Sequence, residues 1–449
     1  MENLTSRGER RFAKSSWLVL LLFGTIGQIA WSVENMYFNL FVFDTVAPNL
    51  ESITLMVQLS GVMATVATLV AGVFSDKIGN RRAFISYGYA IWGVTVALFG
   101  CLSNELTMSL FGVDEVRAVG ITLAMVVIGD CIMTLFGSTA NDAAFNAWVT
   151  DNTESEYRGS VEGVLAVLPL FAMLIVAGGF GILVELIGYR ALFIALGAVI
   201  SISGIIGIFI IKDSPKMEKS GTLRDIFYGF KPSVVKENLP LYVTLIIVLI
   251  YGIACQIFMP YLIIFMKTYL GFSVLEYSAV FAVAILAGAG LNIYLGRLSD
   301  RYNKAKLLYI AAAIFAVGLL GMYLASMIKG KVALLIVFGI FGFVMISGYI
   351  FVSALSGSTV RDYTPRDAVG KLQGVRMVAS VLIPMLIGPM IGNAINKARG
   401  ILLPDAGADA MTTEYIPAPE IFLVGAIFTL LLFAVIPLLC RISNKSRGE

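Results

Sequence analysis

The chain contains no histidine among its 449 residues and only four cysteines. The missing imidazole removes the commonest metal ligand and the commonest proton shuttle. The cysteines lie in or beside apolar runs at no useful spacing, so neither a disulfide framework nor a metal site is indicated. They are Cys101, Cys131, Cys255 and Cys440. Charged residues make up only 14% of the chain and the net charge is +3, which gives nucleic-acid binding no support.

Apolar residues dominate instead, at 58% of the chain. A helix needs about 20 mostly apolar residues to cross a bilayer, so the length suffices for twelve crossings. The apolar runs predict spans at residues 17–43, 52–75, 82–103, 118–149, 159–187, 190–211, 239–266, 274–299, 307–328, 332–360, 370–395 and 420–441. We therefore expect an all-α membrane protein of twelve transmembrane helices in a lipid bilayer. Its domains would be an N-terminal six-helix bundle (1–211), a cytoplasmic linker (212–238) and a C-terminal six-helix bundle (239–449).

The placement of the 32 Lys and Arg residues predicts the orientation of this bundle. With twelve spans, 24 of them fall on the side that holds both termini, 7 fall on the opposite side, and Arg376 lies inside a helix. By the positive-inside rule both termini face the cytoplasm, and we expect a multi-pass protein of the plasma (inner) membrane. The first apolar run continues to Phe43 without a small-residue cleavage site, which favours an uncleaved first helix over a signal peptide.

One charged pattern occurs in both halves of the chain. Residues 72–82 read Gly-Val-Phe-Ser-Asp-Lys-Ile-Gly-Asn-Arg-Arg, and residues 296–306 read Gly-Arg-Leu-Ser-Asp-Arg-Tyr-Asn-Lys-Ala-Lys. Each copy lies between two apolar runs and places an acid four residues after a glycine, with cations following it. Two copies, one in each half, indicate the internal duplication from which secondary transporters are built.

We interpret the two copies as charged latches at the cytoplasmic membrane surface. A glycine lets two backbones pack closely where a helix leaves the membrane, and an acid beside a cation can form a pair at the water line. We expect these groups to pair across the two halves when the outward-facing state forms. The gating residues are Gly72, Asp76, Arg81, Arg82, Asp300 and Arg301. The alternative is a basic loop whose side chains snorkel to the surface without gating.

The pattern resembles the loop signature of the major facilitator superfamily, Gly-x-x-x-Asp-Arg/Lys-x-Gly followed by basic residues. In that family it lies between helices 2 and 3 and, in weaker form, between helices 8 and 9. In the second copy here, Asn303 replaces Gly79. The resemblance implies two pseudo-symmetric six-helix bundles and a transporter that works by alternating access. A membrane enzyme is the least expected function, because the chain offers no metal-ligand cluster and no nucleophile–base pairing.

Polar and ionisable side chains inside the spans are costly, so they mark candidate sites. The first span carries such a set three or four residues apart, on one helix face: Gln28, Trp31, Glu34, Asn35 and Asn39. The fourth span carries a second set at steps of four residues: Thr134, Ser138, Asp142 and Asn146. This stripe should face water or substrate. Asp130 also lies in the fourth span, about 120° round the helix from Asp142.

Three of these residues are candidates for ion coupling: Glu34, Asp130 and Asp142. A carboxylate at low dielectric can take up and release a proton, and beside amide oxygens it can instead hold a sodium ion. The transporter would then need no cofactor beyond a coupling ion, H⁺ or Na⁺. The alternative is that each carboxylate pairs with a Lys or Arg and only holds helices together.

The second half of the chain lacks these acids. A shift of 224 residues carries Glu34 onto Phe258, and a shift of 211 carries Asp142 onto Ser353. We therefore expect the ion site in the N-terminal bundle, with shape and hydrogen bonds from the C-terminal one. The candidate substrate contacts there are Tyr251, Gln256, Asn292 and Arg376, and Pro260 predicts a kink in the seventh span. Arg376 either snorkels to the cytoplasm or presents a cation to an anionic substrate.

Residues 141–158 resemble the fourth helix of the melibiose-type glycoside–cation symporters, with an Asp, two small residues, an aromatic residue and a polar, charged loop. The resemblance implies that Asp142 is an acid for cation and sugar binding. The chain departs from that branch in the second span, where Ala64 and Thr68 occupy the positions of two acids. We expect cation-coupled uptake of a sugar or similar small-molecule substrate by a monomer. The alternatives are a proton-driven exporter of amphipathic compounds and a non-transporting membrane receptor.

Overall fold

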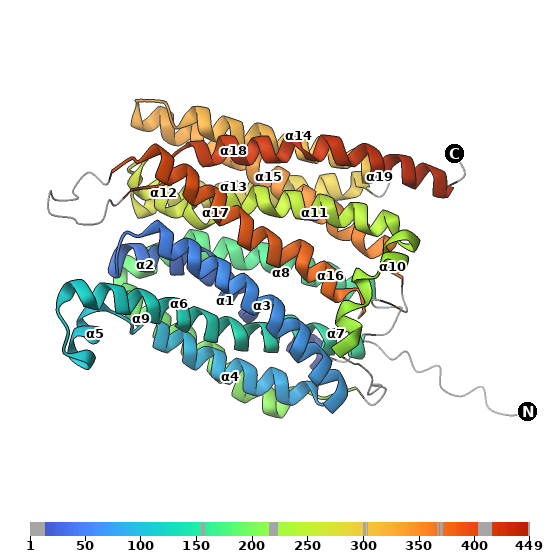
Figure 1. Cartoon of the computed structure of the whole chain (residues 1–449), viewed down its shortest axis with the longest axis horizontal. Coiled ribbons are helices and arrows are strands. Elements are labelled where there is room, and N and C mark those ends of the chain that lie inside the picture. The colour runs from blue at the N-terminus through green and yellow to red at the C-terminus, as the bar shows by residue number, and fades with distance from the viewer. Residues whose placement is uncertain are drawn as a thin grey trace, which may run out of the picture.

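The computed structural model describes residues 14–153, 158–214, 223–299, 302, 304–365, 368, 371–402 and 415–447, and nearly all of them are helical (Figure 1). Before the linker the elements are α1 (Lys14–Val33), η1 (Glu34–Phe38), α2 (Asn39–Thr45), α3 (Leu50–Ile78), α4 (Arg81–Phe99), α5 (Asn104–Phe111), α6 (Glu115–Gly137), η2 (Ser138–Phe145), α7 (Asn146–Asn152), α8 (Arg158–Ile175), η3 (Val176–Phe180) and α9 (Gly181–Ile210). The linker contains η4 (Leu223–Phe230) and α10 (Pro232–Glu237). After it come α11 (Leu239–Phe258), η5 (Met259–Tyr261), α12 (Leu262–Thr268), α13 (Val274–Ser299), α14 (Lys304–Ala325), α15 (Lys331–Tyr363), α16 (Gln373–Met377), η6 (Val378–Leu382), α17 (Ile383–Arg399), α18 (Glu420–Leu430) and α19 (Leu432–Arg447).

Eleven helical runs within the described residues are long and apolar enough to cross a membrane. One of them, Gly163–Ile210, has 48 residues. That is about 72 Å of helix, more than two hydrocarbon cores of about 30 Å. The run turns at Gly188, whose φ of 78° and ψ of 160° are not helical. It therefore makes two crossings, and the predicted all-α architecture of twelve transmembrane helices is confirmed.

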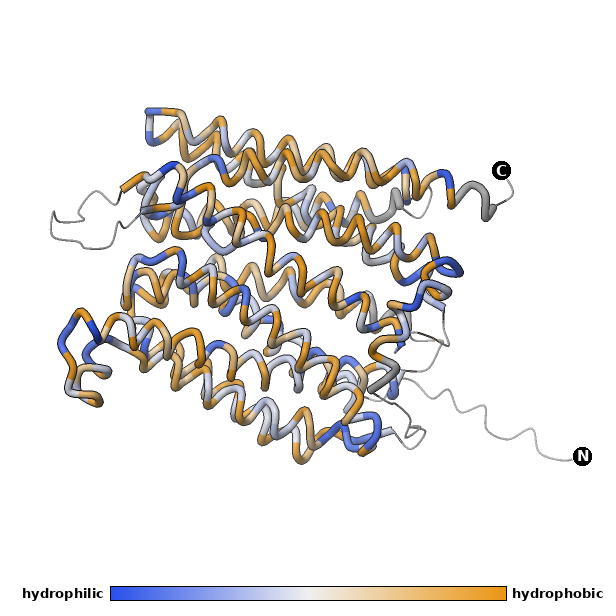
Figure 2. Tube along the Cα trace, in the orientation of Figure 1, coloured by the Kyte–Doolittle hydropathy of each residue, from blue (hydrophilic) through white to orange (hydrophobic). Residues whose placement is uncertain are grey.

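The distribution of hydropathy fits a bundle that lies in a membrane. Figure 2 shows apolar residues along the helices and hydrophilic residues gathered mainly at the two ends of the bundle. The helices before the linker and those after it form two adjoining groups, blue to green and yellow-green to red in Figure 1. The duplicated charge pattern predicted this division into two bundles.

Glycine lets helices of the N-terminal half approach closely. α4 packs along α9, where Gly93 faces the backbone of Gly197. A methyl group at Gly197 would lie 2.8 Å from the Ala97 nitrogen, well inside van der Waals contact. In lipid, such contacts between small residues replace the hydrophobic drive that packs helices in water.

Several helices change their geometry where candidate residues lie. The segments η1, η2, η3 and η6 are π-helical. π-Helical turns are rare and occur mostly at functional sites. The α-helix of the seventh span is interrupted by the 3₁₀ turn η5 at Pro260, the position where a kink was predicted. Glu34 and Asp142 thus lie on two of the non-α segments.

Candidate functional site

Glu34 lies in η1, where the first span meets α3 and α6. Its Oε1 atom accepts hydrogen bonds from Ser60 Oγ and Thr134 Oγ1, each at 3.2 Å. The two hydroxyl oxygens are 2.7 Å apart. Each hydroxyl has one proton, so when one donates to the other, a single donor remains for the carboxyl group. Three spans therefore meet at a carboxyl group whose hydrogen bonding is incomplete.

Asp130 is a second buried acid of this cluster. It lies one turn before Thr134 on α6 and is 2% exposed. Asp130 and Asp142 are the charged neighbours of Glu34. Glu34 Oε2 and Asp130 Oδ1 are buried and have no hydrogen-bond partner among the described residues. The structure thus brings together the three residues predicted for ion coupling.

The charge of this cluster is unbalanced. In the described part of the chain, no Lys or Arg pairs with Glu34, Asp130 or Asp142, so the alternative that these acids are helix-holding ion pairs has no support there. Neighbouring buried carboxylates repel one another unless one is protonated or a cation lies between them. The same residues contain no group of three or more His, Cys, Asp or Glu side chains placed to hold a metal ion. A proton can neutralise one of these carboxylates at a single oxygen atom, without the several ligands that a metal ion needs.

Asp142 lies in η2 of the fourth span. Asn141 Nδ2 donates to its Oδ1 atom at 3.1 Å, and the Tyr89 hydroxyl lies 2.8 Å from Asn141 Oδ1. The stripe predicted along this span begins at buried residues and continues through Asp142, which is half-buried, to Asn146, which is exposed. It leads from the acid cluster to open space, as a path for a solute or an ion requires.

An aromatic pair lies beside the acids. The ring centroids of Trp31 and Trp92 are 5.1 Å apart, with the rings tilted by 45°. Both indole nitrogens are buried. That of Trp31 is directed at the Asp142 carboxylate, whereas that of Trp92 has no hydrogen-bond partner within the described residues and can donate to a water or a ligand. Gln28 is half-buried, and exposed Asn35 donates its amide to the Trp31 carbonyl at 2.8 Å. The Asn35 amide is therefore satisfied within its own helix.

A cavity of about 480 Å³ separates the two halves beyond Asn146. The fourth and fifth spans line one side and α15 lines the other. Its polar side chains come from Asn146, Thr150, Tyr349, Ser353 and Arg361, and the remaining lining is apolar. Thr150 and Arg361 lie in the last turns of α7 and α15, at the end of the bundle where Figure 1 places both termini.

Two predicted residues of the second half take part in packing next to this cavity. The Tyr251 hydroxyl donates to the Tyr349 carbonyl at 2.9 Å, and their rings are 5.8 Å apart. Tyr251 thus lies behind the cavity-lining Tyr349. Asn292 donates to the carbonyls of Gly288 and Ser347, at 2.8 and 3.1 Å, and so ties α13 to α15.

The other two predicted residues of the second half lie on facing helices. Gln256, in α11, packs against Gly388 of α17. Arg376 is half-buried in α16, and its carbonyl accepts a hydrogen bond from Ser380 at 2.8 Å. Within the described residues, no hydrogen bond joins Tyr251, Gln256 or Asn292 to the acid cluster, so the structure does not bring them together with it.

The first predicted latch is closed within the N-terminal half. Arg81 is 5% exposed and pairs with Asp76. It also donates to Ser75 Oγ, and its Nε atom lies 3.1 Å from Asp151 Oδ2. Gly79 ends α3 in the left-handed region, at φ 72°. The latch therefore joins the end of α3, the start of α4 and the end of α7.

Other predicted gating residues have different surroundings. The Arg82 backbone N–H donates to Asp213 Oδ1 at 2.9 Å. The expected close backbone approach at Gly72 is not found among the described residues, where a methyl group on Gly72 would meet nothing within 4 Å. Asp300 and Arg301 lie outside the described residues, so their pairing across the halves stays a prediction.

The opposite end of the bundle is closed by ion pairs between the halves that we did not predict. Lys267 Nζ lies 2.7 Å from both carboxylate oxygens of Asp44, and Lys397 Nζ lies 2.6 Å from Glu51 Oε1. Tyr189 also donates to Asp44, at 2.8 Å. The sequence shows these charges at the ends of predicted spans, but it does not show which of them pair.

Hydrogen bonds between the halves continue inward from these pairs. The Thr54 and Tyr261 hydroxyls are 2.7 Å apart, and Gln58 Nε2 donates to the Leu386 carbonyl at 2.7 Å. Asn39, predicted to contact substrate, is 2% exposed and donates to the Pro260 carbonyl at 3.3 Å. In this state Asn39 is therefore part of the closed interface between the halves.

Comparison with known proteins places this fold. The family model described as Major Facilitator Superfamily matches residues 17–389. The "Multi-drug resistance efflux pump PmrA homolog" of Lactococcus lactis subsp. lactis (strain IL1403) is 22% identical over 320 residues, covering 68% of this chain and 75% of that protein. A crystal structure of a mutant of the nucleoside transporter NupG has a TM-score of 0.65 at 12% identity and covers 94% of this chain and 99% of its own. A bacterial homolog of the human lysosomal transporter Spinster, inward-facing and unoccupied, has a TM-score of 0.66 at 14% identity and covers 97% and 98%.

Proposed function

Because the chain belongs to the major facilitator superfamily, a family of membrane transporters, we propose that it is a secondary active transporter that couples a cation gradient to the movement of a small polar solute. The observation that carries this proposal is the cluster of Glu34, Asp130 and Asp142, called here the Glu34 cluster. Three spans converge on a buried carboxyl group that has acidic neighbours and no cationic partner among the described residues. An intramembrane acid of this kind must be neutralised, and reversible neutralisation by H⁺ or Na⁺ is what coupling requires.

In this proposal the structure represents the inward-facing state. Ion pairs and hydrogen bonds between the halves close the outer end, and the cavity beside Asn146 lies at the end with the termini. Rocking of the halves would separate the outer pairs and bring the two cytoplasmic latches together. The termini would face the cytoplasm across the plasma (inner) membrane, and one chain would suffice as the transport unit.

The membrane potential gives the scale of the available work. One charge that crosses 100 mV contributes about 2.3 kcal/mol, enough to concentrate a solute roughly 50-fold. A single proton or sodium ion at the Glu34 cluster is therefore sufficient for accumulation. No second coupling site is needed.

For the solute we propose a sugar or a similar polar molecule taken up by symport. The support is the stripe from Thr134 to Asn146, the aromatic pair of Trp31 and Trp92, and the resemblance of residues 141–158 to the melibiose-type symporters. Sugars stack on aromatic faces and hydrogen bond to amides and carboxylates, which this region offers together.

A second candidate function is proton-driven export of amphipathic compounds. The observation that favours it is the lining of the cavity between the halves, where leucine, valine, isoleucine and alanine side chains outnumber polar ones. The partial likeness to a protein named as a multidrug efflux pump homolog points the same way.

Counterflow in reconstituted vesicles tests both functions. The purified protein is reconstituted in liposomes, and the liposomes are loaded with one unlabelled sugar at a time. Entry of the same sugar in labelled form is then measured with and without a proton or sodium gradient. Uptake that rises above counterflow under one inward gradient supports cation-coupled sugar transport. The proposal of sugar uptake fails if none of the sugars exchanges and if, in the same vesicles, an amphipathic dye is transported against its concentration gradient in exchange for protons that move in the opposite direction.

A further inference from the structure

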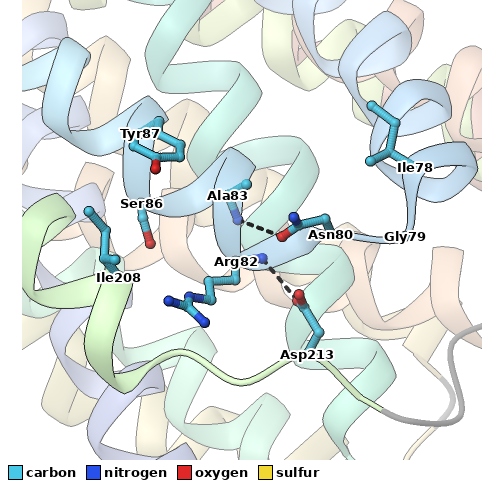
Figure 3. Close-up of a pocket in the computed structure, with 9 residues that line it drawn as sticks. All are labelled: Ile78, Gly79, Asn80, Arg82, Ala83, Ser86, Tyr87, Ile208 and Asp213. Atoms are coloured by element: carbon cyan, nitrogen blue, oxygen red, sulfur yellow. Dashed lines mark hydrogen bonds between the residues drawn. The ribbon is translucent and has the colours of Figure 1, made fainter.

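The linker between the halves is held to the bundle at two places. At its start, Asp213 Oδ1 accepts the backbone N–H of Arg82 at 2.9 Å, where α4 begins (Figure 3). Further along, η4 packs against α16 of the C-terminal half. A methyl group at Gly374 of α16 would lie only 2.4 Å from the carbonyl oxygen of Ile226 in η4. η4 therefore has a fixed place beside α16 and α10, at the end of the bundle where Figure 1 places both termini.

The 3₁₀ geometry of η4 distributes its side chains over three faces. With three residues per turn, residues i and i+3 lie on the same face. Ile226 and Gly229 share the face toward α16, where a methyl group at Gly229 would lie 3.0 Å from Val375. Phe227 and Phe230 share a second face and are 68% and 47% exposed. Two phenyl rings thus project together from the linker.

Two lysines lie beside the aromatic ring of the third face. Lys231 Nζ and Lys371 Nζ lie 5.6 Å and 5.5 Å from the centroid of the Tyr228 ring, within the range in which a ring attracts a cation. Both lysines are exposed, and neither forms an ion pair with an acid of the described residues. The two ammonium groups repel each other, because both are close to one ring. An anion that contacts both would remove this repulsion.

η4 lies at the level where a spanning helix enters the bilayer. Tyr242, in the first turn of α11, donates its hydroxyl to the Gly229 carbonyl of η4. Leu239, the first residue of α11, is 45% exposed. Exposed phenylalanines beside exposed lysines are typical of a segment that lies in the headgroup region of a membrane. The lysines alone would fit any phosphate, but the two phenyl rings at this level favour a phosphate that carries acyl chains.

We propose that η4 binds an anionic phospholipid of the leaflet on the side of the termini. Lys231 and Lys371 hold its phosphate, and Phe227 and Phe230 lie at the boundary between headgroups and acyl chains. A zwitterionic lipid binds less tightly, because its own ammonium group lies close to the two lysines. None of these four residues belongs to the Glu34 cluster, so the proposal does not depend on the proposed transport function.

Native mass spectrometry of the full-length protein in detergent tests this site. The protein is titrated with phosphatidylglycerol and phosphatidylcholine that have identical acyl chains, and we expect phosphatidylglycerol to bind more tightly. Lys371→Gln should weaken phosphatidylglycerol binding about fivefold, the factor that corresponds to roughly 1 kcal/mol for one lysine near an anionic lipid surface. Arg441→Gln, which changes an exposed arginine at the same end of the bundle, is the matched control and should have no effect.

The phenyl rings provide a second readout. Phe227→Ser should weaken phosphatidylglycerol binding about tenfold, close to the lower end of what burial of one phenylalanine side chain contributes. Phe111→Ser, at an exposed phenylalanine of α5 at the opposite end of the bundle, is the control and should leave that binding nearly unchanged.

Four results would overturn the proposal. They are equal binding of the two lipids to the parent, equal effects of a variant and its control, displacement of the lipid by inorganic phosphate at comparable concentration, and a dimer that Phe227→Ser abolishes. The third result would make the ligand a soluble phosphate, and the fourth would make the occupant a second copy of the chain. Equal thermal unfolding temperatures of all variants confirm that binding is compared between folded proteins.

Discussion

The ion pair between Asp44 and Lys267 should set how readily the outer end of the transporter opens. Lys267 Nζ lies 2.7 Å from both oxygens of Asp44, and the two side chains are 40% and 18% exposed. They belong to opposite halves, so the pair exists only while the outer end is closed. We predict that Lys267→Gln shifts the protein toward outward-open conformations.

The size of that shift follows from the exposure of the pair. A partly wet pair contributes about 1 kcal/mol or less, because solvent screens it and two side chains lose freedom. Loss of about 1 kcal/mol changes the ratio of closed to open molecules about fivefold. Tyr189 donates to Asp44 at 2.8 Å in the parent protein. Because this bond does not involve Lys267, we expect Asp44 to keep a partner in the variant.

Double electron–electron resonance measures this ratio directly. Nitroxide labels on cysteines introduced at Glu105 and Lys329, both exposed and near the outer end of different halves, report the separation of the two bundles. Lys331→Gln is the matched control, because Lys331 pairs with Glu276 at 3.0 Å inside one half. Distance distributions that change equally in both variants, or in neither, would refute the assignment of Asp44 and Lys267 as an outer gate.

Three further predictions concern Asp142, the latch formed by Asp76 and Arg81, and the packing of α4 on α9. Asp142→Asn should abolish gradient-driven accumulation but retain exchange in vesicles, and full accumulation would reduce Asp142 to a structural residue. Asp76→Ala removes a partner of Arg81 and should slow turnover while leaving substrate affinity nearly unchanged. The expected reduction is at most about fivefold, because such an ion pair is worth about 1 kcal/mol or less. Unchanged turnover would exclude a gating role. Gly197→Ala forces a methyl group against the backbone of α4 and should cost about 1–3 kcal/mol in unfolding assays, whereas Gly120→Ala, with nothing within 4 Å, should be close to neutral. Equal stability of the two glycine variants would contradict the packing of α4 on α9.

The sequence predicted the spans because every helix that crosses lipid needs about 20 mostly apolar residues. Hydropathy located both crossings of the 48-residue run, and Gly188 fell between the predicted spans 159–187 and 190–211. Pro260 and Gly79 acted locally, through a missing N–H and a left-handed φ, so their effects on the seventh span and on α3 were also predictable. Gly72 was not, because whether a neighbouring helix crosses it depends on the tertiary packing.

The candidate site was predictable only in part. Glu34 and Asp142 stood out because acids are rare inside spans. Ser60 could not be recognised, since a lone serine in an apolar span equally often bonds its own helix. Asp130 was a candidate from its place in the fourth span, but its proximity to Glu34 could not be predicted, because that proximity depends on how the first and fourth spans pack.

The contacts between the halves could not be predicted from the sequence. Asp44 and Lys267 are separated by 223 residues, and Glu51 and Lys397 by 346. Their pairing depends on how the two bundles are tilted in one state of the cycle. A local pattern contains no information about that tilt.

The central claim is that the Glu34 cluster binds the coupling cation, and solute-induced charge movement tests it most directly. Reconstituted protein is adsorbed on a solid-supported membrane, and the current that follows addition of a transported solute is recorded as a function of pH and sodium concentration. Glu34→Gln keeps an acceptor for Ser60 and Thr134 but removes the titratable charge. The account predicts that this variant folds, binds solute with no dependence on pH or sodium, and gives no coupled current, while counterflow of the solute persists. A variant whose current and pH profile match those of the parent would show that the cation binds elsewhere.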